Sequence, residues 1–60
     1  MIEKAVFKKC KKLEESRFAP YAGDTVFIID RTYLIHDEQI ITDFDVAYHK
    51  AIFEVEETVD

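Results

Sequence analysis

Hydrophobic positions in the first part of the chain recur at the spacing of an amphipathic helix. At about 100° per residue, four apolar side chains fall on one narrow stripe, with lysines on the opposite side. The stripe consists of Ile2, Val6, Cys10 and Leu13. Neither Gly nor Pro interrupts residues 2–17, whereas Pro20 and Gly23 follow shortly afterwards. The pattern therefore predicts an N-terminal helix over residues 2–17 and a connector over residues 18–24.

From residue 25 onwards, the hydrophobic pattern becomes typical of short strands. Three apolar runs rich in β-branched and aromatic residues are bounded by polar breaks, and each is too short to be a helix. The runs are Val26–Ile29, Thr32–Ile35 and Gln39–Thr42. They predict an α+β fold, in which the helix is followed by a three- to four-stranded antiparallel meander within the β-rich residues 25–56. The opening Gly23-Asp24, followed by alternating Val and Ile, resembles the first strand of SH3-like small barrels, which implies that the meander curls into a barrel.

Residues 43–56 fit two secondary structures. As a hairpin, residues 44–48 would pair with residues 51–55 across a turn at His49-Lys50. As a helix, residues 43–56 would have an apolar stripe but would leave Val46 and Phe53 on the solvent side, and the fold would be helix–hairpin–helix. The stripe would consist of Phe44, Ala47, Tyr48, Ala51, Ile52 and Val55. The β-branched and aromatic content favours the hairpin, although the turn lacks the Gly, Asn or Asp that tight hairpins prefer. The helix stays open as the alternative.

The length and composition predict one small folded domain, residues 1–60, that ends in an acidic tail at residues 57–60. A chain of 60 residues has a thin core, but 48% hydrophobic residues with five Phe and three Tyr argue against disorder. The single Cys10 excludes an internal disulfide and fits a reducing compartment. No apolar run has the length of a signal peptide or a membrane span. We therefore expect a cytoplasmic protein that does not bind membranes.

Charged residues are divided unevenly along the chain. Residues 1–17 carry six Lys or Arg and three Glu, whereas residues 18–60 carry two Lys or Arg and ten Asp or Glu. The first segment therefore has a net charge of +3 and the second −8, which gives −5 for the whole chain. This split predicts two surfaces of opposite sign, with different partners.

No motif in the chain indicates catalysis, a metal or a cofactor. Cys10 shares the apolar stripe of the predicted helix, which favours core packing over reactivity. His36 and His49 lie thirteen residues apart at predicted turns, and this spacing is not the signature of a zinc site. With one Gly and one Ser, the chain has neither a phosphate-binding loop nor a serine triad. We therefore predict that the protein is not an enzyme and holds no cofactor.

The acidic part of the chain is the predicted contact surface. We expect a small protein-binding module, acting as a regulator or inhibitor, that docks on another protein with a basic surface. The candidate contact residues are Tyr33, Asp43, Phe44, Asp45, Tyr48, Glu54 and Glu56. An inhibitor that mimics the phosphates of DNA would use the same acidic surface.

Two further interpretations concern the remaining surfaces. A nucleic-acid-associated protein would use the lysine face of the predicted helix, which consists of Lys4, Lys8, Lys11 and Lys12. The isoelectric point near 4.9 argues against nucleic acid as a partner. The run Val26–Ile29 is apolar on both faces of its strand, so the sheet must close into a barrel or meet another chain. This second interpretation predicts a homodimer.

Overall fold

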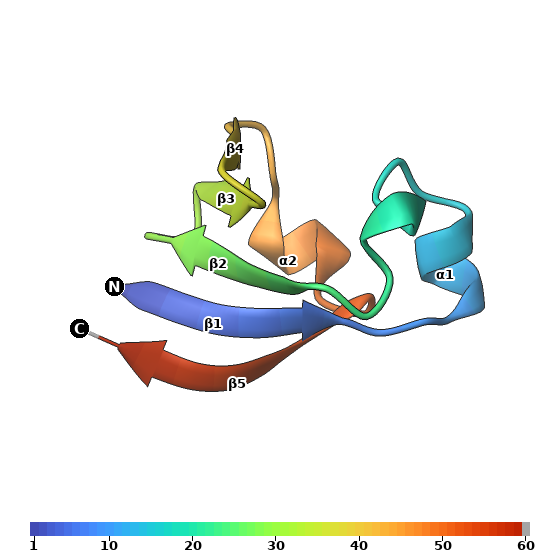
Figure 1. Cartoon of the computed structure of the whole chain (residues 1–60), viewed down its shortest axis with the longest axis horizontal. Helices are drawn as coiled ribbons and strands as arrows, with labels where there is room; N and C mark the ends of the chain where they lie inside the picture. The colour runs from blue at the N-terminus through green and yellow to red at the C-terminus, as the bar shows by residue number, and fades with distance from the viewer. Residues whose placement is uncertain (60) are drawn as a thin grey trace.

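The computed structural model describes residues 1–59 and consists mostly of one five-stranded antiparallel sheet (Figure 1). The strands are β1 (Ile2–Phe7), β2 (Thr25–Ile29), β3 (Tyr33–His36), β4 (Gln39–Ile41) and β5 (Phe53–Val59). The helical elements are α1 (Lys11–Glu14), the 3-10 helix η1 (Ala19–Tyr21) and α2 (Val46–His49). The strands are arranged in the order β4-β3-β2-β1-β5, so the last strand returns to lie beside the first. Asp60, predicted as part of the acidic tail, lies outside the described residues.

The predicted α+β fold with an N-terminal helix over residues 2–17 is wrong. Residues Ile2–Phe7 form β1, which pairs with β2 on one side and with β5 on the other, and only Lys11–Glu14 are α-helical. The sequence alternates as a strand here, because Ala5 and Phe7 face the core while Val6 lies on the opposite face. The neighbouring strands β2 and β5 provide hydrogen-bond partners for the backbone of β1. This pairing outweighs a helical pattern that had only weak local support.

The middle of the chain forms the antiparallel meander β2-β3-β4. Ile28 pairs with Leu34, and Ile35 pairs with Ile40. The polar breaks are tight turns whose central residues have positive φ angles: Asp30 (49°) with Arg31 (59°), and Asp37 (47°) with Glu38 (67°). Two consecutive positive φ angles are the signature of the type I′ turn, whose twist matches that of the strands. The resemblance of residues 23–29 to a first barrel strand is corrected as well, because β2 is the second strand of this sheet.

Residues 43–56 form neither the predicted hairpin nor the long helix. A single helical turn, α2, begins after Asp45, whose carboxylate accepts a hydrogen bond from the backbone N–H of Tyr48 at 3.1 Å. The chain then crosses to the far edge of the sheet, where β5 pairs with β1 rather than with residues 44–48. The structure of this segment depends on pairing with β1, which lies far away in the sequence, and the local sequence pattern does not predict that pairing.

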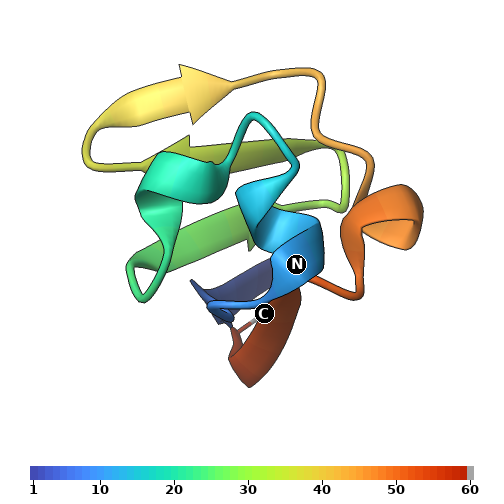
Figure 2. The same ribbon diagram turned by 90° about the vertical axis from the view of Figure 1, so that its right-hand side faces the viewer.

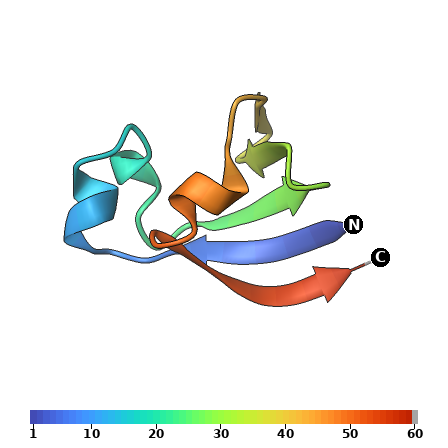
Figure 3. The same cartoon turned by 180° about the vertical axis from the view of Figure 1, so that it is seen from behind.

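The core lies between the inner face of the sheet and the helical elements (Figures 1 and 3). Its sheet side includes Ala5, Val26, Ile28 and Leu34, which are fully buried, and α2 contributes Val46. Four phenylalanines form an aromatic cluster with ring centroids 5.4–6.4 Å apart. These are Phe7, Phe18, Phe44 and Phe53. The predicted burial of Leu13 and Ile28 is confirmed, since both are 0% exposed.

The long connection between β1 and β2 closes one end of this core. Figure 2 views the molecule from that end, where α1 lies in front of the stacked strands. Leu13 and Phe18 pack from the connection into the core, and the backbone of Gly23 donates a hydrogen bond of 2.9 Å to the carbonyl of Phe7. Gly23 has a φ of 81°, a conformation that glycine adopts without strain. The connection is therefore part of the packed domain and not a free linker.

Candidate protein-binding surface

The sheet has an outer face that no element of the described chain covers. Paired residues of neighbouring antiparallel strands share a face, so the register identifies which side chains lie together. One row across all five strands is Ile40, Ile35, Phe27, Lys4 and Glu57. A second row is Tyr33, Ile29, Ile2 and Val59, and a third is Thr25, Val6 and Glu54. We call these twelve residues the outer face.

Apolar side chains on the outer face are exposed to an unusual extent. Ile40 is 63% exposed, Val59 47%, Phe27 41% and Ile2 40%. They come from four different strands, and Phe27 lies in the middle row between Ile35 and Lys4. Single exposed apolar residues are common, but a contiguous exposed group is typical of an interaction site. The outer face is therefore the leading candidate for a binding surface.

One border of the outer face is acidic. Strand β5 is the edge strand on this side and carries three Glu and no Lys or Arg. Glu54 pairs with Val6 and Glu57 pairs with Lys4, which places both carboxylates on the outer face. Glu56 falls where the register shifts between β1 and β5, so it is the extra residue of a β-bulge. An apolar surface with this border presents both contact area and charge.

The structure separates the predicted contact residues into two groups. Tyr33 and Glu54 lie on the outer face, and Glu56 lies at its edge. Asp43, Asp45 and Tyr48 instead lie around α2, which packs against the inner side of the sheet. The two groups do not form one surface, because the core lies between them.

Phe44 corrects the prediction of an exposed aromatic anchor. Its side chain is only 2% exposed, and its ring packs against Phe18 with centroids 5.4 Å apart. By contrast, Tyr48 is 80% exposed and belongs to the rim of a groove between α1 and α2. The aromatic residue that the outer face does present is Phe27, which the sequence reasoning did not select.

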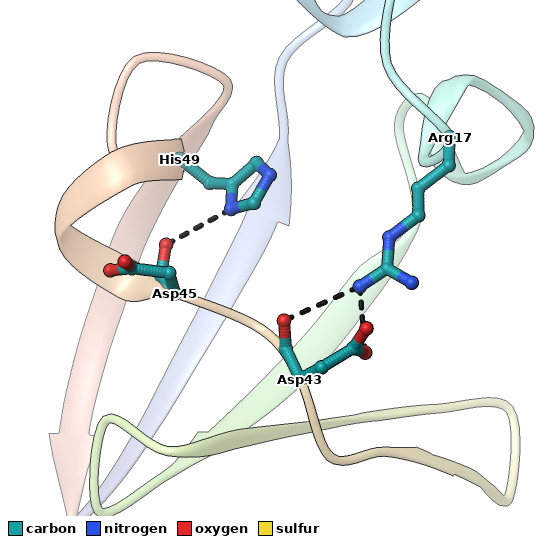
Figure 4. Close-up of polar contacts among 4 residues, drawn as sticks. All are labelled: Arg17, Asp43, Asp45 and His49. Carbon is teal, nitrogen blue, oxygen red and sulfur yellow. Dashed lines mark hydrogen bonds and ion pairs between the residues drawn. The ribbon is translucent and has the colours of Figure 1, made fainter.

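The groove beside α2 has a volume of about 530 Å³. Two of its lining residues, Arg17 and His49, make polar contacts with neighbouring segments (Figure 4). Arg17 donates a 2.7 Å hydrogen bond to the Asp43 carboxylate, joining the segment after α1 to the segment before α2. This bond lowers the pKa of Asp43 below its ordinary value and raises the pKa of Arg17. His49 stacks on the ring of Phe44, and its Nδ1 lies 3.0 Å from the carbonyl oxygen of Asp45. These contacts give Arg17 and His49 structural roles, which leaves the groove a weaker candidate than the outer face.

The other candidate chemical groups also have structural partners. His36 lies 2.8 Å from the Asp24 carboxylate and stacks on the ring of Tyr21, which joins β3 to the β1–β2 connection. Cys10 is partly buried against the core and precedes α1. Among residues 1–59, no three His, Cys, Asp or Glu side chains are grouped so that they could hold a metal ion. None of the helices in this part of the chain is long and apolar enough to cross a membrane.

The lysines no longer form one continuous face. Lys4 lies within β1 on the outer face, paired with Phe27 on one side and Glu57 on the other. Lys8 follows β1, and Lys11 and Lys12 belong to α1. The face that a single long helix would have presented to nucleic acid therefore does not exist.

Comparison with protein families, with curated proteins and with solved structures gives no match for this chain.

Proposed function

We propose that the protein is a small binding module that uses the outer face of its sheet to dock on another protein. The observation that carries the proposal is the exposed apolar group from four strands, with Phe27 at 41% exposure and Ile40 at 63%. A few residues near the centre of a protein interface provide most of its binding energy, and aromatic side chains are enriched at interface cores. A surface of this kind, on a domain with few other features, supports regulation or inhibition by occupancy and not by catalysis.

The proposed partner has a basic contact surface. The border of the outer face carries Glu54 and Glu57, and the chain has a net charge of −5. Acidic residues at a rim steer a basic partner and speed association, while the apolar centre sets the rate of dissociation. A reducing compartment such as the cytoplasm fits this proposal, because the single Cys10 has no second cysteine to pair with.

Affinity capture with matched variants tests the proposal. The unaltered protein, a Phe27→Ser variant and a Tyr48→Ser variant are each immobilised and incubated with native cell extract, and the captured proteins are compared. Phe27 lies on the outer face, whereas Tyr48 is even more exposed but lies on α2. The same partner should bind the unaltered protein and the Tyr48 variant, and binding should fall at least about tenfold for the Phe27 variant. Loss with Tyr48→Ser and retention with Phe27→Ser would transfer the site to the groove and overturn the proposal.

A second copy of the chain is the alternative occupant of the outer face. The same exposed side chains favour it, because a dimer would cover the apolar surface of a domain with a thin core. Sedimentation of the purified protein at about 50 μM decides between the two occupants. A mass of one chain supports a different protein as partner, and a mass of two chains that reverts to one in Phe27→Ser supports the homodimer.

A further inference from the structure

The outer face continues onto the free edge of β5, which has the properties of a site for one more strand. β5 is seven residues long, lies at the end of the sheet order and is exposed at every residue from Glu54 to Val59. Within the described chain it pairs with β1 alone, so one side of its backbone has no strand beside it. The opposite edge, β4, has only three residues. Of the two edges, β5 offers the longer template for main-chain hydrogen bonds.

The charges on β5 exclude one class of added strand. Antiparallel pairing of β5 with β5 of a second copy, centred on the middle of the strand, would place Glu56 or Glu57 opposite its own counterpart. Like charges directly opposite each other destabilise a strand pair. The three glutamates therefore protect this edge against self-association and select for a strand of opposite charge.

A hollow of about 320 Å³ at this edge fits a long cationic side chain. It is lined by Val6, Lys8, Glu54, Val55 and Glu56. The valines provide apolar walls for the methylene stem of an arginine or lysine, and the two glutamates provide carboxylates for its charged end. Lys8 already stands at the hollow and would compete with the incoming cation.

From the edge, the charges and the hollow together, we infer that β5 binds an extended basic segment of a partner protein by strand addition. The rows of the outer face define the preferred residues of that segment. A cation belongs opposite Glu57, where it continues the row that ends in Lys4 and Glu57. This inference rests on the proposed function and names the kind of partner that the same surface takes.

Synthetic peptides test the inference without knowledge of the natural partner. The probe is a seven-residue peptide of alternating arginine and valine, and the sign control alternates glutamate and valine. A third peptide has the arginine–valine sequence with alternate backbone nitrogens methylated, so that it keeps its charge but has lost hydrogen-bond donors. Binding is measured by fluorescence anisotropy at low salt, and amide hydrogen exchange of β5 is followed by NMR.

The basic peptide should bind and slow amide exchange in β5, while the acidic peptide should not bind. Methylation should weaken binding at least about tenfold, because strand addition depends on main-chain hydrogen bonds. Equal binding of the methylated peptide would show attraction by charge alone and overturn the inference. Absence of binding by the basic peptide would overturn it as well, while Phe27-dependent capture of a partner would leave the proposed function standing.

Variants of the protein locate the site. The double change Glu54→Gln/Glu56→Gln should weaken binding of the basic peptide about tenfold. The control Glu14→Gln/Glu15→Gln removes the same charge at exposed positions at the end of α1, and it should change binding less than about twofold. Lys8→Ala should strengthen binding, because it removes the competing cation from the hollow. Equal losses in the two double variants would contradict the assignment to β5.

Discussion

The β3–β4 turn predicts a substitution that should stabilise the protein. Asp37 and Glu38 join the paired residues His36 and Gln39, and Glu38 has a φ of 67°. A residue with a β-carbon pays about 1–2 kcal/mol for this left-handed conformation. Glycine avoids that cost but loses about 0.5–1 kcal/mol more conformational entropy on folding. Glu38→Gly should therefore raise the free energy of unfolding by about 0.5–1 kcal/mol.

Thermal and urea unfolding followed by circular dichroism measure this change. For a domain of this size, the gain corresponds to a rise in Tm of about 2–8 °C. Gln39→Gly is the matched control, because the neighbouring residue is extended within β4 and should lose about 0.5–1 kcal/mol. Glu38→Gln separates the effect of the lost charge. If Glu38→Gly destabilised the protein as much as Gln39→Gly does, the assignment of a strained type I′ turn would be refuted.

Three further predictions concern the core, an ion pair and the lysines. Leu13→Ala should cost about 2–5 kcal/mol in chemical denaturation because Leu13 is fully buried, whereas Lys12→Ala should change stability by less than about 0.5 kcal/mol; a silent Leu13→Ala would mean that the connection does not belong to the core. Asp43→Asn should lower Tm at neutral pH, and the difference should vanish as the pH falls through the folded-state pKa of Asp43, which the hydrogen bond from Arg17 holds below its ordinary value; a difference that persisted unchanged at low pH would contradict the ion pair. At about 50 mM salt the protein should show no measurable affinity for a DNA duplex, because its lysines lie on separate elements; binding lost on neutralising Lys8, Lys11 and Lys12 would contradict this.

The meander was predictable because its signals are local. The predicted breaks between the apolar runs were Asp30-Arg31 and His36-Asp37-Glu38. Asp30-Arg31 and Asp37-Glu38 form the observed turns, whereas His36 is the last residue of β3. Such runs are too short for helices, and charged residues between them leave few alternatives. Local pattern and tertiary structure agree in this part of the chain.

The two ends of the chain were mispredicted for one shared reason. Residues 2–7 fit a period of 3.6 as well as a period of two over so short a stretch, and their strand structure depends on partners in β2 and β5. Residues 53–59 in turn need β1, which lies at the other end of the sequence. Pairing between distant segments is not encoded in either segment alone, and this explains why both errors occurred together.

The candidate site was predictable only in its general character. The run Val26–Ile29 is apolar on both faces of its strand, which indicated that the second face of the sheet would pack against something as well. That second face is the outer face, where Phe27 is exposed. The register then decides that Phe27 points outward and Ile28 inward, which composition does not reveal. Phe44 was misassigned because its burial comes from an aromatic cluster assembled by four separate segments.

Site-specific photo-crosslinking in cells that express the protein tests the central claim most directly. A photoreactive phenylalanine analogue replaces Phe27 on the outer face, or Tyr48 on α2 as the exposed control. We expect covalent adducts of the chain with another protein from position 27 and none of comparable yield from position 48. Adducts from position 48 with none from position 27 would contradict the assignment of the outer face as the binding surface.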